Sequence, residues 1–307
     1  MSYIKSVLIF LLLFVCSSLK AQNTPDAYFN KAYNYLLYDK NQAIIFFDKC
    51  IEADNDYVAA YLLRGITKFK LGKYESALVD FTAALERNEK LTIAYMYKGY
   101  TFKQLGQDDL ALESFNAYIE NKEGGSSLDF KVLGRAKLIE GDHDGAVEAF
   151  NKAISENPTE SEYYYQFLAY FEAQAYELAI EQINQAIALN SEFYGYYIHR
   201  GKSNFLVGNM DAAMTDYSRA IRLSDEVSDS YYLRGLVLDT LQQHNSAITD
   251  FSEAIRLNPE DGTYYSKRGN AKFATGNRES ACLDWTIAGN LGYYEEFDKI
   301  KTLCNRQ

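Results

Sequence analysis

Apolar and small residues recur at helical spacing in a short unit that runs from Tyr231 to Pro259. Gly235 lies in the first half of the unit, and Ala247, Phe251 and Ala254 follow in the second half. Intervals of four and three residues place side chains on one face of an α-helix. The pattern therefore predicts two helices joined by a turn, with the second helix ended by the closing proline.

The same unit recurs along the chain with a period of about thirty-four residues. The positions equivalent to Ala247 are Ala43, Ala77, Ala111, Ala146, Ala179, Ala213 and Ala281. Four residues further on are Phe47, Phe81, Phe115, Phe150, Ile183, Tyr217, Phe251 and Trp285, and three beyond those are Cys50, Ala84, Tyr118, Ala153, Ala186, Ala220, Ala254 and Ala288. The small position of the first helix holds Gly65, Gly99, Gly134, Gly201, Gly235 and Gly269, with Phe167 in the fifth copy and Ala32 in the first, which is one residue short.

These recurring residues resemble the tetratricopeptide repeat. The resemblance covers about residues 26–295 and implies an all-α fold, a right-handed α-solenoid of about eight helix-turn-helix units with a C-terminal capping helix. Each helix pair is too small to bury its own apolar face, so neighbouring pairs stack into one core. We expect a single domain over 22–307, with repeats at about 26–57, 58–91, 92–126, 127–159, 160–193, 194–227, 228–261 and 262–295.

The first 21 residues differ from the rest of the chain. Lys5 precedes an apolar run from Val7 to Cys16, and a polar segment ends at Ala21, which is the order of a secretory signal peptide. The run is too short to span a bilayer, and we expect no transmembrane span in the mature chain. The segment resembles export signals of Gram-negative bacteria and predicts a periplasmic protein, with outer-membrane association or secretion as alternatives. Lipidation at Cys16 is a further alternative, although Val15 precedes it where lipoprotein signals have a small residue.

Arginine and aspartate occur together in four of the repeats. The pairs are Arg64 with Asp80, Arg200 with Asp216, Arg234 with Asp250, and Arg268 with Asp284. The other repeats lack both partners, as in Lys98 with Ser114, Leu133 with Ala149, and Gln166 with Gln182. Because the two residues appear and vanish together, we expect bidentate ion pairs between the two helices of those repeats, as structural contacts.

Tyrosine is unusually frequent, with 27 among 307 residues. Six of these lie four residues before the small position and are predicted to be core: Tyr61, Tyr95, Tyr163, Tyr197, Tyr231 and Tyr265. Five other tyrosines on first helices do not occupy this predicted core position: Tyr97, Tyr100, Tyr164, Tyr165 and Tyr232. The resemblance implies that first helices line a concave groove that holds a partner, so packing and partner binding are both open for these five.

Polar residues on the first helices are further candidates for partner binding: Lys131, Arg135, His199, Lys202, Lys267 and Asn270. Basic groups in a chain of net charge -11 would suit an acidic peptide, and an ordinary solvated helix face is the alternative. Some members of the family clamp a C-terminal carboxylate with lysine and asparagine. Lys131 and Arg135 have the spacing for this, but Tyr165 stands where asparagine is expected, so we do not expect that mode.

No constellation of residues favours catalysis, a metal or a cofactor. His143 and His244 occupy the turn position held by tyrosine in other repeats, and His199 lies in a repeat without another histidine. Cys50 replaces a buried alanine, which favours an inert packed thiol. The acidity is spread over the chain without a basic face, which argues against nucleic acid as a partner.

The C-terminal end is predicted to carry a cap. Tyr294, Phe297, Ile300 and Leu303 lie at helical spacing, and a capping helix over 294–305 would return Cys304 to the neighbourhood of Cys282. In an oxidising compartment we expect these cysteines to form a disulfide, with two unpaired buried thiols as the alternative.

The sequence thus predicts a non-enzymatic interaction scaffold or adaptor of the bacterial envelope, which binds a protein or peptide segment in the groove. A structural component of an envelope or secretion assembly is the alternative.

Overall fold

The computed structural model describes residues 23–122, 125–295 and 300–304. The predicted signal peptide and Cys16 lie outside the described residues. The chain divides into two compact units, one ending at Asp142 and the other beginning at His143. This division falls within the fourth predicted repeat, and each unit is described by itself below.

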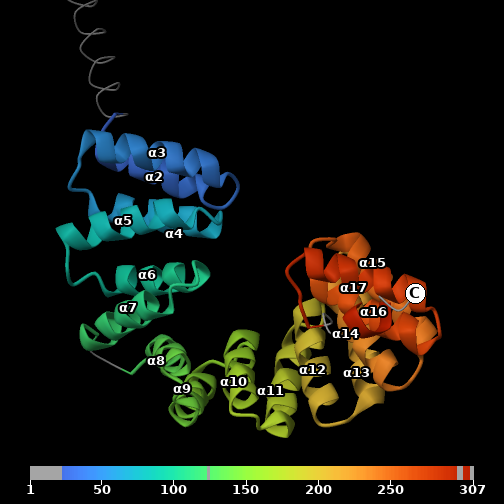
Figure 1. Ribbon diagram of the computed structural model, residues 1–307. Helices are drawn as coiled ribbons and strands as arrows, with labels where there is room; N and C mark the ends of the chain where they lie inside the picture. The colour runs from blue at the N-terminus through green and yellow to red at the C-terminus, as the bar shows by residue number, and fades with distance from the viewer. Residues whose placement is uncertain (1–22, 123–124, 296–299, 305–307) are drawn as a thin grey trace, which may run out of the picture. The chain divides into compact units, whose positions relative to one another are not determined.

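The first unit consists of helices that follow one another in chain order (Figure 1). They are α2 (Pro25–Tyr35), α3 (Lys40–Ala53), α4 (Val58–Lys70), α5 (Tyr74–Arg87), α6 (Thr92–Gln104), α7 (Asp108–Glu120) and α8 (Ser127–Glu140). The first helix of each of the first three repeats packs on the second helix of that repeat, and the second helix packs on the first helix of the next. A continuous row of packed helix pairs is therefore the architecture of this unit.

The second unit is built in the same way. Its helices are α9 (His143–Glu156), α10 (Glu160–Glu172), α11 (Tyr176–Leu189), α12 (Tyr194–Leu206), α13 (Met210–Leu223), α14 (Ser228–Thr240), α15 (His244–Leu257), α16 (Gly262–Ala274) and α17 (Arg278–Asn290), followed by the π-helix η1 (Ile300–Cys304). The predicted all-α repeat fold is confirmed. In the described part of the chain, no helix combines the length and the apolar character needed to cross a membrane.

Close approach of the two helices in a repeat depends on the small residue of the first helix. A Cβ atom at Gly65 would lie 2.7 Å from the ring of Phe81, and one at Gly235 would lie 2.6 Å from the ring of Phe251. Such distances are too short for a Cβ atom unless the ring shifts. Glycine at these positions therefore lets the two helices approach closely, whereas the first repeat has Ala32 together with Phe47, both fully buried.

The fifth repeat exchanges the sizes of these two positions. Phe167 stands where glycine is usual, and Ile183 replaces the aromatic residue of the second helix. Both side chains are fully buried. The departure at Phe167 that is evident in the sequence is thus compensated by the smaller residue opposite.

The turn that follows the first helix contains one residue of positive φ in every predicted repeat after the first. These residues are Gly72, Gly106, Gly141, Gln174, Gly208, Gln242 and Gly276. Backbone in this left-handed region ends a full-length first helix, and glycine adopts it without strain. The first repeat has no such residue among its described positions 36–39, and α2 has 11 residues where α4 has 13.

All four predicted arginine–aspartate pairs are present. In the second repeat, Nε and Nη2 of Arg64 donate to the two carboxylate oxygens of Asp80 at 3.0 and 2.6 Å. Nη1 of Arg64 donates to Asp48 of the preceding repeat at 2.6 Å. The other arginines bond their aspartates in the same way and reach back to Asn184, Ser218 and Ser252.

The C-terminal cap differs in part from the prediction. Helix α17 is followed by Gly292 with φ +86°, and the next amide, that of Tyr293, donates to the carbonyl of Ala288. This reversal leaves Tyr294 68% exposed and non-helical, so the expected helix does not begin there. Phe297 lies outside the described residues.

The described helical part of the cap is η1, which packs against α17. Its last residue, Cys304, is joined to Cys282 by a disulfide with a Cα–Cα distance of 5.7 Å. The predicted pairing is therefore present, although among the described residues the cap is helical over 300–304 and not at Tyr294.

Candidate partner-binding surfaces

Three residues predicted to bind a partner come together in the first unit. The ring of Tyr97 stacks on Phe81 of the preceding repeat, with centroids 5.8 Å apart, and Tyr100 packs edge-on against Phe115 at 5.2 Å. The guanidinium of Arg135 lies 4.4 Å from the centre of the Tyr100 ring. These side chains join adjacent repeats by aromatic and cation–π contacts. Lys131, one turn before Arg135 on α8, is half-buried.

A second group gathers in the second unit around His199. Its Nε2 lies 3.0 Å from the hydroxyl of Tyr164, and its ring packs edge-on against Phe167. Tyr165 stacks on Phe150 with centroids 5.8 Å apart. Burial, and to a smaller extent the charge of Lys202, lowers the pKa of His199 to about 4. The imidazole is therefore neutral at physiological pH and acts as a polar group within the packing.

The remaining candidates lie further along the second unit. The ring of Tyr232 packs against Tyr264 at 4.9 Å, and burial raises its pKa. Lys267 forms an ion pair with Glu295 at 3.6 Å. Asn270, one turn before the end of α16, is half-buried. For the five tyrosines left open by the sequence, the structure shows packing contacts in each case.

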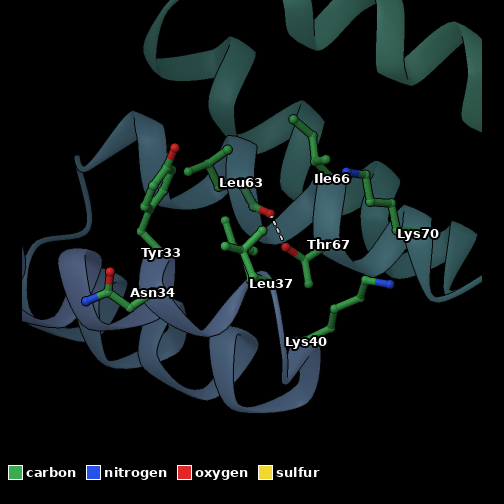
Figure 2. Close-up of a pocket in the computed structure, with 9 residues that line it drawn as sticks. Tyr33, Asn34, Leu37, Lys40, Leu63, Ile66, Thr67 and Lys70 are labelled. Carbon is green, nitrogen blue, oxygen red and sulfur yellow. Dashed lines mark hydrogen bonds between the residues drawn. The ribbon is translucent and has the colours of Figure 1, made fainter.

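A pocket of about 430 Å³ opens between α2 and α4 in the first unit, as Figure 2 shows. Leu63, Ile66 and Thr67 of α4 line one side. The residues that complete the lining are Tyr33, Asn34, Leu36, Leu37, Lys40 and Lys70. The hydroxyl of Thr67 donates to the carbonyl of Leu63 at 2.6 Å, so this side of the pocket is largely apolar.

The pocket lies where the first repeat is shortened. Helix α2 ends at Tyr35 after 11 residues, whereas α4 has 13, and the next residues, Leu36 and Leu37, are part of the pocket lining. Leu37 is left 95% exposed and Tyr33 58% exposed beside the opening. Apolar side chains exposed together around a pocket are typical of an interaction site.

Two lysines give the pocket a charge opposite to that of the chain. Lys40 and Lys70 lie at one end, and Tyr33 and Asn34 lie at the other (Figure 2). The nine described residues that line the pocket include no carboxylate, whereas the whole chain has net charge -11. The neighbouring Asp39 caps α3 by accepting from the amide of Gln42. Neither lysine forms an ion pair within the described residues.

Comparison with known proteins places this arrangement in a family. Two family profiles described as tetratricopeptide repeat match the chain, one over residues 62–126 and 164–228 and the other over 132–160 and 228–261. The chain belongs to the tetratricopeptide-repeat family. Tetratricopeptide repeats form non-catalytic scaffolds for protein–protein interaction, and this is the function class of the chain.

Individual relatives extend the comparison. A crystal structure of MamA protein is 27% identical with a TM-score of 0.52, and the match covers 58% of this chain and 96% of that chain. A hetero-tetramer of APC/C Cut9-Hcn1 is 15% identical with a TM-score of 0.65, covers 91% of this chain and 56% of the other, and shows the fold alone. Serine/threonine-protein phosphatase 5 of Homo sapiens is 32% identical over 77 residues, which are 25% of this chain and 15% of the phosphatase.

Reasoning from the tetratricopeptide-repeat pattern did not single out the pocket residues Tyr33, Leu37, Lys40 and Lys70. The signal is nevertheless in the sequence. The first repeat is one residue short, and apolar residues such as Leu37 stand in the turn where most repeats have glycine. In the described residues, no group of three His, Cys, Asp or Glu side chains is arranged to hold a metal ion.

Proposed function

We propose that this protein is an exported, non-enzymatic adaptor that binds a protein segment along its first helices. The observation that carries the proposal is the open apolar pocket between α2 and α4, which is lined by these two successive first helices, the turn after α2 and the first residue of α3. Leu37 and Tyr33 are exposed beside the pocket, and apolar surface exposed in this way is typical of a site that a partner covers.

The proposed export rests on two features. The first 21 residues have the order of a signal peptide, and the Cys282–Cys304 disulfide supports an oxidising compartment, where such bonds persist. Intact-mass analysis of the protein from the native envelope should give a chain beginning at Gln22. A chain beginning at lipid-modified Cys16 would contradict a soluble periplasmic protein and indicate anchoring.

Site-specific photocrosslinking in living cells tests the binding surface. We expect a crosslinking amino acid at position 37 to give a discrete adduct with another protein. The matched control is position 79, because Val79 is 67% exposed on a second helix of the same unit. An adduct at position 79 alone would move the interface to the second helices and favour a structural component of an envelope or secretion assembly.

A further inference from the structure

We infer that the pocket between α2 and α4 selects a peptide with a large apolar side chain flanked by carboxylates. The apolar side chain enters beside Leu63 and Ile66, and the carboxylates bind Lys40 and Lys70. This inference rests on the proposed function, because it takes a protein segment as the partner, and it adds the chemical class of that segment.

The lining of the pocket favours an apolar anchor. The hydroxyl of Thr67 donates its hydrogen to the carbonyl of Leu63, and Thr67 is almost fully buried, so this residue offers a peptide no hydrogen-bond donor beside Leu63 and Ile66. Peptide recognition by helical proteins commonly uses one or two such buried side chains. Burying Leu37 against the peptide would add to the favourable transfer of apolar surface from water.

The charge around the pocket favours acidic flanks. Lys40 and Lys70 are both exposed and lie at the same end, where no lining residue carries negative charge (Figure 2). Lysine has a compact charge on a flexible stem and can meet carboxylates in several geometries. At 0.1 M salt the Debye length is about 10 Å, so acidic residues beyond that distance act only weakly on a peptide in the pocket.

The same charges disfavour the two alternative occupants. A symmetric dimer formed through this pocket would bring four lysines into one interface with no carboxylate among the lining residues, which costs free energy. The N-terminal residues 1–21 contain Lys5 and Lys20 and no acidic residue, so that segment carries the wrong charge. An acidic peptide from another protein fits both the apolar and the charged part of the pocket.

Fluorescence anisotropy with defined peptides tests the inference on the full chain. The probe is a dye-labelled peptide with a central Leu-Phe pair and two aspartates on each side. Two matched peptides replace the aspartates by lysines or the Leu-Phe pair by serines. We expect the probe to bind at least tenfold more tightly than either, and to weaken as salt is raised.

Paired charge reversals identify the lysines. The double variant Lys40→Glu with Lys70→Glu should lower affinity for the acidic probe at least tenfold and prefer the basic peptide. The control is Lys73→Glu with Lys90→Glu, which makes the same charge change at two exposed lysines outside the pocket. The control should bind the acidic probe like the natural chain.

A third variant tests the apolar part. Leu37→Ser should weaken binding several-fold while Tm stays unchanged, because the Leu37 side chain is almost fully exposed.

Equal binding of acidic and basic peptides, or full binding by the pocket double variant, would overturn the inference. Self-association of the natural chain in sedimentation experiments, lost in that variant, would instead assign the pocket to a second copy. An adduct at position 37 with no selective peptide binding would leave the proposed function standing and reject only this partner chemistry.

Discussion

At the scale of single residues, one arginine joins three helices. Arg64 of α4 bonds Asp80 of α5 and also Asp48 of α3. The two aspartates differ in surroundings, because the Asp80 side chain is 1% exposed and that of Asp48 is 44% exposed. The ion pair of Arg64 with Asp80 should therefore contribute much more to the stability of the first unit than the ion pair of Arg64 with Asp48.

Replacing the two aspartates separately should reveal that difference. Asp80→Ala leaves the largely buried Arg64 without its main partner and should lower the free energy of unfolding by about 3 kcal/mol. Asp48→Ala removes an exposed partner and should cost less than about 1 kcal/mol. Urea unfolding of both variants measures the two losses of unfolding free energy. Equal losses would show that burial of the aspartate does not decide how much its ion pair contributes to stability.

The sequence predicted one half of this contact. Arginine and its aspartate could be paired because they appear and vanish together among the repeats. The backward contact could not be found in this way, because its acceptors are Asp48, Asn184, Ser218 and Ser252, and any side-chain oxygen at that place suffices. Because the acceptor residue differs from repeat to repeat while the hydrogen bond is kept, comparison of the repeats does not reveal this contact.

His199 adds a dependence on pH at the same scale. Its pKa falls from 6.5 to about 4, mainly because of burial. Between these values the unfolded chain binds a proton that the folded chain does not, so stability is complete above pH 6.5 and falls as the pH drops toward 4. The shift in pKa corresponds to a loss of about 3 kcal/mol in the free energy of unfolding, because each pKa unit is worth about 1.36 kcal/mol.

Comparison of His199→Gln with the natural chain isolates this contribution. The difference in unfolding free energy between pH 7 and pH 4.5 should be smaller in the variant, because glutamine does not titrate. NMR titration provides a direct check, since only three histidines occur in the sequence. A His199 resonance that titrates near pH 6.5 would contradict the effect of burial.

At the scale of elements, the two helices of a repeat share a fixed amount of space. Gly235 approaches the ring of Phe251, whereas the fifth repeat has Phe167 opposite Ile183. Gly235→Ala should destabilise the second unit by about 1–3 kcal/mol, because the strain of overpacking exceeds the gain in helix propensity. Phe251→Ile should also be destabilising alone, because it leaves a cavity.

The double variant tests whether the two positions are coupled. Because isoleucine opposite alanine relieves the clash, we expect the combined loss to be smaller than the sum of the single losses by at least about 0.5 kcal/mol. Urea unfolding of the four proteins completes the cycle. Additive losses would show that the size exchange in the fifth repeat is incidental.

Turn geometry marks the limit of prediction at this scale. The repeat pattern located every helix pair, yet the pocket depends on where α2 ends relative to α4. A missing residue in a turn can shorten a helix, tighten a loop or shift a register, and the sequence alone does not distinguish these. Leu37 is identified as a surface residue only once the end of α2 is known.

At the scale of the whole molecule, stability in a repeat protein is a sum of local terms. Each repeat contacts its neighbours, so a change at one end should not spread far. The sequence predicted this architecture because the same positions recur together. The expected capping helix does not begin at Tyr294, because Tyr294 and Glu295 are non-helical and the described helical part of the cap is 300–304.

The Cys282–Cys304 bridge permits a direct test of that locality. The bridged residues are 22 apart in sequence, and loss of this bridge in the double variant Cys282→Ala with Cys304→Ala should cost about 3 kcal/mol on the chain-entropy account. Hydrogen exchange should accelerate in α17 and α16 and stay unchanged in α10 and α11. The natural chain under reducing conditions should show the same pattern, which separates loss of the bridge from loss of the side chains. Faster exchange throughout the second unit would mean that the unit opens as a single cooperative body, and the additive description would then fail for this protein.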